Sequence, residues 1–120
     1  MAFTFKARRP FSAPVTVHVP QADGTMAELS FTGHFMILSE SERQSIGDAA
    51  VATGQENRAK AVLMQAVTGW GVDLLGEDGA PLPFSRETLA ALLDDVAIFI
   101  AVNTAYGAGI LGQKDLTRKN

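Results

Sequence analysis

The chain has 120 residues, enough for one average hydrophobic core and too few for two. Hydrophobic residues make up 47% of the chain and charged residues 19%, a balance that argues against global disorder. There is no cysteine, which excludes disulfide bonds and thiolate metal sites. We therefore predict a single domain over residues 1–120, with flexible ends at 1–12 and 113–120.

The net charge of −3 is unevenly distributed. Most of the basic residues lie near the two ends of the chain: Lys6, Arg8, Arg9, Lys114, Arg118 and Lys119. The part between them is strongly acidic. Two interpretations stay open: the basic ends aid solubility, or they contact the acidic body of a second copy or an acidic partner. A clustered basic face of the kind that binds nucleic acid is not evident, so no nucleic-acid partner is expected.

Two segments alternate between apolar and polar residues and predict β-strands. The first carries valines at every second position: Val15, Val17 and Val19. The second runs from Leu29 to Ile37, and the Asp23-Gly24 pair between the segments indicates an antiparallel hairpin. Its odd-numbered side chains should be buried. Pro14 and Pro20 favour an edge position for the first strand, or a two-stranded sheet.

Two helices are predicted after the hairpin. Ser39 and Glu42 form a Ser-x-x-Glu capping box, which starts a helix of about a dozen residues that ends near Gly54. Four of its side chains are expected to point inward: Ile46, Ala49, Ala50 and Val51. A second helix is predicted from Gln55 to Thr68, with Gly69 at its C-cap.

Residues 69–85 follow as a loop that contains the only tryptophan, Trp70. Glycines and prolines alternate there with apolar side chains, so the loop is expected to pack on the body of the protein. Ser85 then caps a third helix, and Asp94 or Asp95 caps a fourth.

The fourth helix is apolar over much of its circumference. It is therefore either the central helix of the fold or a helix that exposes a partner-binding surface. Gly107, Gly109 and Gly112 are expected to interrupt its end. The predicted fold class is α+β: an N-terminal antiparallel β-hairpin followed by about four α-helices in a small bundle.

Catalytic, cofactor and metal sites are not expected, and the chain is not predicted to be an enzyme. His18 and His34 fall on the exposed face of the hairpin, where we interpret them as surface neighbours across the strands. Glu28 is the only candidate for a third metal ligand nearby. No run of eighteen apolar residues and no signal-peptide pattern is present, so neither membrane insertion nor secretion is expected.

A series of short motifs follows one order along nearly the whole chain: Ala13-Pro14-Val15-Thr16-Val17, Phe31-Thr32-Gly33-His34-Phe35, Leu38-Ser39-Glu40-Ser41-Glu42, Gly69-Trp70-Gly71-Val72, Glu77-Asp78-Gly79, Leu82-Pro83-Phe84-Ser85 and Lys119-Asn120. This order, together with the chain length, resembles the phage tail assembly chaperones. The glycines at 107, 109 and 112 depart from the family, whose final helix is less rich in glycine.

The resemblance implies a non-enzymatic protein of long-tailed phages or prophages. It would act in the cytoplasm of the bacterial host, keep the tape measure protein soluble while tail tube proteins assemble around it, and be absent from the mature virion. Self-association into an open spiral or oligomer is expected, because head-to-tail contacts that do not close suit a long client. The candidate partner-binding residues are Trp70, Pro83, Phe84, Phe99, Val102 and Tyr106.

Three alternatives remain. The first is a structural phage tail or head-tail joining protein, although a tube subunit should contain more strands than one hairpin. The second is a general protein-interaction module. A small enzyme or nucleic-acid regulator is the third.

Overall fold

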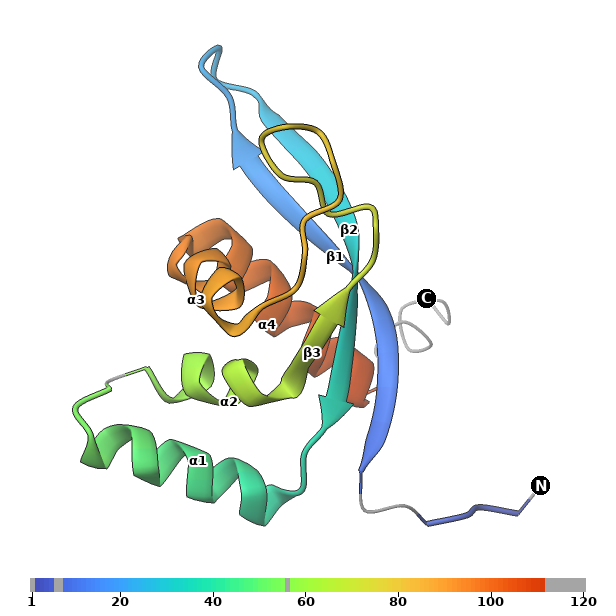
Figure 1. The fold of residues 1–120 in the computed structure, drawn as a ribbon, viewed down its shortest axis with the longest axis vertical. Coiled ribbons are helices and arrows are strands. Elements are labelled where there is room, and N and C mark those ends of the chain that lie inside the picture. Colours follow the sequence, from blue (N-terminus) through green and yellow to red (C-terminus); the bar gives the residue numbers. More distant parts are fainter. Residues whose placement is uncertain (1, 6–7, 56, 112–120) are drawn as a thin grey trace.

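The computed structural model describes residues 2–5, 8–55 and 57–111. Within these residues lie, in chain order, β1 (Arg9–Pro20), β2 (Met26–Ile37), α1 (Glu40–Ala52), α2 (Arg58–Ala66), β3 (Val67–Trp70), α3 (Arg86–Asp94) and α4 (Val96–Leu111). The strands form one antiparallel sheet in the order β1-β2-β3. The helices lie mainly on one side of it (Figure 1). The predicted α+β class, with an N-terminal hairpin followed by four helices, is therefore confirmed.

The hairpin has the predicted antiparallel pairing and buried face. Val15 lies opposite Phe31 in the β1–β2 ladder, and both side chains are buried. Asp23 accepts hydrogen bonds from the backbone and hydroxyl of Thr25, while Gly24 adopts a positive φ of 88° in the turn. The alternation therefore places odd-numbered side chains toward the helices, as expected.

The strand β1 begins earlier than predicted, at Arg9, so residues 9–12 are not a flexible end. The physical reason is aromatic packing. The Phe11 ring stacks on Phe35, with 5.1 Å between the ring centroids, and on Tyr106 at 6.1 Å. Residues 113–120, the other predicted flexible end, lie outside the described part of the chain.

Both ends of α1 are capped as predicted. The Ser39 hydroxyl accepts from the Glu42 N–H, and the Glu42 carboxylate accepts from the Ser39 N–H, each at 3.1 Å. Gly54 follows the helix with a φ of 89°. The expected inward face is only partly buried: Ile46 and Ala50 are half-buried, whereas Ala49 and Val51 are exposed.

The predicted second helix is too long. It ends at Ala66, and the next four residues form β3, in which Gly69 lies opposite His34 instead of capping a helix. Pairing with β2 satisfies the backbone groups of a segment rich in strand-forming residues, and it buries Val67 in the core. This tertiary pairing overrides the helical spacing of the apolar residues.

The fourth helix also differs from the prediction at its end. Gly107 and Gly109 do not interrupt α4, which continues to Leu111. A Cβ at Gly109 would collide with the Phe11 ring, so this glycine permits close packing of helix on strand. Gly112 lies outside the described residues. Of the two predicted caps, Asp95 is the one used: its carboxylate accepts from the Ile98 N–H at 3.2 Å.

One continuous core joins the sheet to α2, α3 and α4. Its largest fully buried side chains include Phe35, Leu63 and Leu89. The Tyr106 hydroxyl accepts from the Leu38 N–H and donates to the Met36 carbonyl, each at 3.3 Å, which ties α4 to the end of β2. Among the described helices none alone has the length and hydropathy of a membrane span; α3 and α4 reach them only as a pair bent by 107°.

Candidate partner-binding grooves

The loop between β3 and α3 is closed by its own side chains. The Trp70 indole N–H donates to the Leu82 carbonyl at 2.6 Å, and the Phe84 ring meets the indole edge-on at 4.8 Å. The Leu82 N–H in turn donates to the Leu74 carbonyl at 2.8 Å. Trp70 therefore packs the loop against itself, whereas Val72 nearby stays 78% exposed.

Asp73 fastens the same loop to the sheet. Its carboxylate accepts from the Thr32 N–H at 3.0 Å and from the Thr32 hydroxyl at 2.9 Å. These hydrogen bonds hold the pKa of Asp73 below its ordinary value. The Gly71 N–H donates to the Thr32 carbonyl at 2.9 Å, so both backbone groups of Thr32 point toward β3.

The six predicted partner-binding residues do not form one surface. Val102 and Tyr106 are buried in the core, so they are not presented to a partner in this conformation, and Phe99 is half-buried. Trp70 is engaged inside its loop, beside the exposed Phe84 and Pro83. None of the six lines either of the two grooves described below.

The two histidines are not neighbours across the strands, contrary to our interpretation. His18 lies opposite Glu28, with 3.9 Å between its Nδ1 and the carboxylate, and His34 lies opposite Ser12, whose hydroxyl is 2.7 Å from its Nδ1. The register thus gives each histidine a different polar partner. In the part of the chain that the structure describes, no three His, Cys, Asp or Glu side chains gather as metal ligands.

The outer edge of β1 is protected by prolines. Thr32 turns both backbone groups toward β3, so the Pro14–Thr32 pair is not hydrogen-bonded, and Pro14 directs its backbone away from β2. Residues of the same parity along β1 do likewise, and Pro10 and Pro20 are among them. Since proline has no N–H, three positions of this edge offer no donor to an added strand. The predicted edge position of β1 is confirmed.

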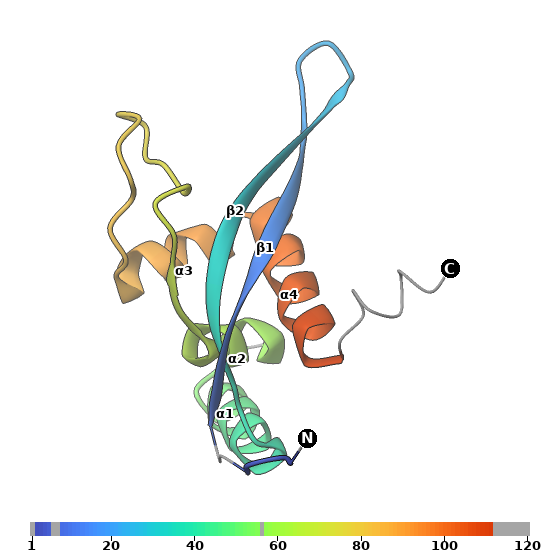
Figure 2. The same ribbon diagram turned by 90° about the vertical axis from the view of Figure 1, so that its right-hand side faces the viewer.

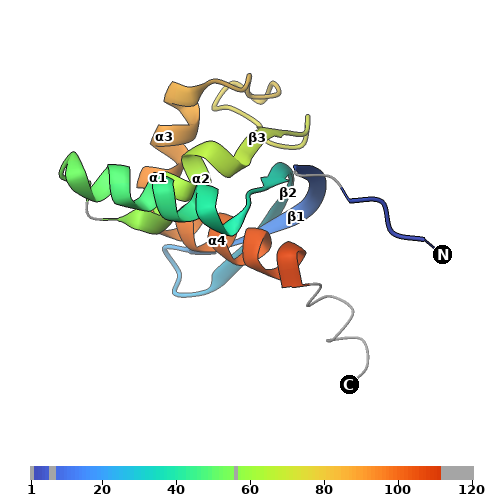
Figure 3. The ribbon, with the colours of Figure 1, turned by 90° about the horizontal axis from the view of Figure 1, so that it is seen from below.

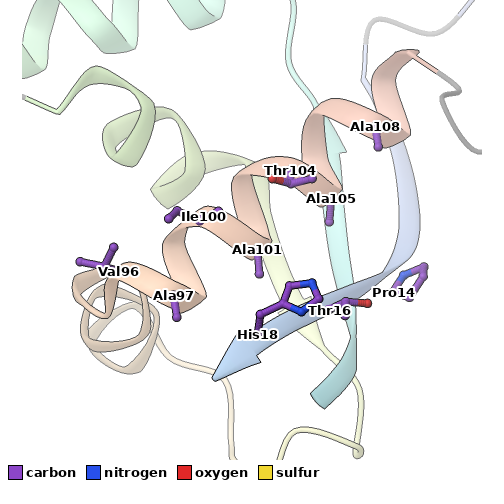
Figure 4. A pocket seen from close by; sticks show the side chains of 10 residues that line it. All are labelled: Pro14, Thr16, His18, Val96, Ala97, Ile100, Ala101, Thr104, Ala105 and Ala108. Carbon is purple, nitrogen blue, oxygen red and sulfur yellow. The ribbon is translucent and has the colours of Figure 1, made fainter. Parts of the chain in front are cut away.

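The first groove, which we call the strand–helix groove, runs between this edge and α4 and has a volume of about 740 Å³. Pro14, Thr16 and His18 form its strand wall (Figure 4). Its helix wall is a row of small side chains at helical spacing: Ala97, Ala101, Ala105 and Ala108. The row leaves room above the strand because alanine extends little from the helix axis.

Larger apolar residues border the strand–helix groove. Ile100 and Val96 line it and are 57% and 72% exposed. Burying an apolar side chain of this size is favourable by about 1.5–3 kcal/mol, so covering these two residues stabilises a complex with a partner. Among the residues that the structure describes, its walls contain no acidic or basic side chain except His18. The groove can therefore make mainly apolar contacts, and the hydroxyl groups of Thr16 and Thr104 can form hydrogen bonds.

The second groove, the hairpin–loop groove, lies between the upper hairpin, the β3–α3 loop and the start of α4, and has a volume of about 550 Å³. Figure 2 shows the hairpin and the loop both projecting beyond the helices. Apolar side chains line it, among them Leu29, Leu74 and Ile98. The charged residues that line it in the described part of the chain, Asp73 and Asp95, are both acidic.

The sequence shows that α4 and the hairpin are apolar elements, but it does not show which of their residues remain accessible. The signal lay in the alanine spacing of α4 and in the proline spacing of β1, which together mark a helix lying along a protected edge. The comparisons do not add to this picture, since no protein-family model, curated protein or solved structure matches the chain.

Proposed function

We propose that the protein is a non-enzymatic phage tail assembly chaperone that binds the tape measure protein and keeps it soluble during assembly of the tail tube. The motif order of the sequence suggests this function. The observation that carries it is the strand–helix groove, an accessible apolar channel bordered by Ile100 and Val96. In this proposal the protein acts in the bacterial cytoplasm, associates with further copies of itself, meets the tail tube protein, and leaves before the virion matures.

The shape of the groove favours a helical client segment over an extended one. An extended peptide binds at a sheet edge through backbone hydrogen bonds, and the prolines of β1 remove donors from that edge. A helix needs no such bonds and buries an apolar face in a groove through residues at three- and four-residue spacing. Small residues that are only half-buried, Ala97 and Ala108, allow a second helix to approach α4 closely. Long helical clients rich in apolar surface therefore suit the groove.

The test is co-expression of the full chain with the tape measure protein encoded beside it, scoring how much of the client stays soluble. Ile100→Asp places a charge in the strand–helix groove and is expected to lower the soluble fraction at least several-fold, because the charge loses hydration against an apolar helix. Val72→Asp is the matched control, since Val72 is more exposed and lies outside both grooves.

Three results would count against the proposal. The client stays insoluble with the unaltered protein, the two variants behave alike, or the protein is found as a stoichiometric part of purified virions. The last result would instead support a structural tail or head-tail joining protein.

A further inference from the structure

Two N-terminal phenylalanines do not pack into the hydrophobic core. Phe3 and Phe5 are 73% and 78% exposed, and residues 2–5 extend away from the body of the molecule (Figure 3). The only aromatic contact found for either ring within the described residues is the Arg9 guanidinium, 5.9 Å from the centre of Phe3. Because the two phenylalanines are separated by one residue, an extended chain presents both on the same side.

Along the hairpin–loop groove, part of the β2 edge is not paired with β3. The strand β3 pairs only with Gly33, His34 and Phe35, so it stops short of the upper half of β2. Thr32 directs its N–H and C=O toward β3, and Ser30 and Glu28 share its parity. Their backbone groups therefore face the side on which β3 would continue. Ser30 lies at the wall of the groove, beside Leu29 and Phe31.

We propose that residues 2–6 of one copy, the N-terminal arm, dock in the hairpin–loop groove of a second copy. The arm adds a short strand to β2 beside Ser30, and Phe3 and Phe5 enter the groove between Leu29, Leu74 and Ile98. This inference rests on the proposed function, in which several copies assemble along one client. It specifies the contact that joins them.

Charge supports this pairing of arm and groove. The arm carries Lys6 and no acidic residue, and Arg8 after it is held in an ion pair with Glu42 of its own α1. The charged residues that line the groove within the described part of the chain are Asp73 and Asp95. Opposite charges of this kind steer association and fix orientation. Within the described ranges, the strand–helix groove has no acidic side chain and so lacks this complementarity.

Chain length shows why the occupant comes from another copy. Phe5 precedes Arg9 by four residues, which span at most about 14 Å. The nearest strand residue of the groove, Phe31, lies opposite Val15, six residues along β1 from Arg9, or about 20 Å. The backbone of Phe5 therefore cannot pair beside Ser30 of its own chain, which lies one residue farther along the ladder than Phe31. Because arm and groove are different surfaces, the contact is heterologous and repeats head to tail.

Sedimentation velocity of the full chain over a range of concentrations tests the proposal. The unaltered protein is expected to form dimers and longer species. The donor variant Phe3→Ser/Phe5→Ser and the acceptor variant Leu29→Lys are each expected to raise the dissociation constant at least about tenfold. Leu29 is 59% exposed, so the substitution leaves the core intact. Val72→Lys, outside the groove, is the control and should associate like the unaltered protein.

Mixing the two defective variants gives the sharpest result. The donor variant keeps an intact groove and the acceptor variant keeps an intact arm, so an equimolar mixture should form one-to-one heterodimers and nothing larger. Any one of three results would overturn the proposal. The unaltered protein stays monomeric, the donor variant associates normally, or the mixture forms no heterodimer. Client solubility is scored separately: if copies associate through the arm but the tape measure protein stays insoluble, the proposed function fails while the arm contact stands.

Discussion

Two glycines of α4 provide a matched test of how this helix packs on the sheet. A Cβ at Gly107 would meet no atom within 4 Å, whereas a Cβ at Gly109 would collide with the Phe11 ring. Replacing a helical glycine with alanine favours the helix by about 0.8–1 kcal/mol. Gly107→Ala should therefore stabilise the protein by about that amount.

Gly109→Ala has the same helical gain but must move a ring that has little freedom. Phe11 stacks on both Phe35 and Tyr106, and each aromatic pair contributes about 0.5–1.5 kcal/mol. Losing both pairs costs about 1–3 kcal/mol, so the variant should be about 1–3 kcal/mol less stable than Gly107→Ala. Urea unfolding followed by circular dichroism measures this difference, provided that the dependence of the unfolding free energy on urea concentration is the same in both variants.

A background variant separates the collision from any other effect at position 109. In Phe11→Ala the ring is absent, so adding Gly109→Ala should become stabilising, and the double-mutant cycle should show coupling between the two sites. Equal stabilisation by Gly107→Ala and Gly109→Ala in the native sequence would show that Phe11 does not restrict position 109. So would a cycle without coupling.

Three further predictions concern the loop and the caps. Trp70→Phe removes the indole donor to the Leu82 carbonyl and should destabilise the protein by about 1 kcal/mol, measured by thermal unfolding against Phe84→Leu as a packing control. Hydrogen bonds from Thr32 lower the pKa of Asp73 from 3.8 in the folded protein. The stability contributed by the Asp73–Thr32 hydrogen bonds is therefore fully present above pH 3.8 and is lost as the pH falls through the lowered pKa of the folded state. A step in Trp70 fluorescence should appear in that acidic range and be absent in Asp73→Asn. Ser39→Ala should cost about 1 kcal/mol by removing the cap of α1, and an equal loss in Ser45→Ala, in the middle of the helix, would contradict the capping explanation.

Local signals predicted much of this fold. Ser39 with Glu42, Ser85 and Gly54 mark helix ends through short-range hydrogen bonds and backbone conformation, and each does so in the structure. The alternation in the hairpin predicted its two strands and its buried face, but not the register that separates His18 from His34. These features depend on neighbouring residues, so one sequence is enough to find them.

Features that depend on distant partners were missed. Val67–Trp70 continues the helical spacing of α2, and only the presence of β2 beside it makes a strand the better arrangement. Gly109 looks like a helix breaker until Phe11, nearly a hundred residues earlier, is placed against it. The grooves were missed for the same reason, because the accessible residues of α4 are decided by where β1 and the β3–α3 loop lie.

Amide hydrogen exchange of the full chain, alone and in complex with the soluble tape measure protein, tests the central claim most directly. Client binding is expected to slow exchange in the first half of α4 and around Thr16 and His18, the walls of the strand–helix groove, and to leave α1 unchanged. Protection confined to α1 or to the loop around Trp70, with α4 exchanging as in the free protein, would contradict it.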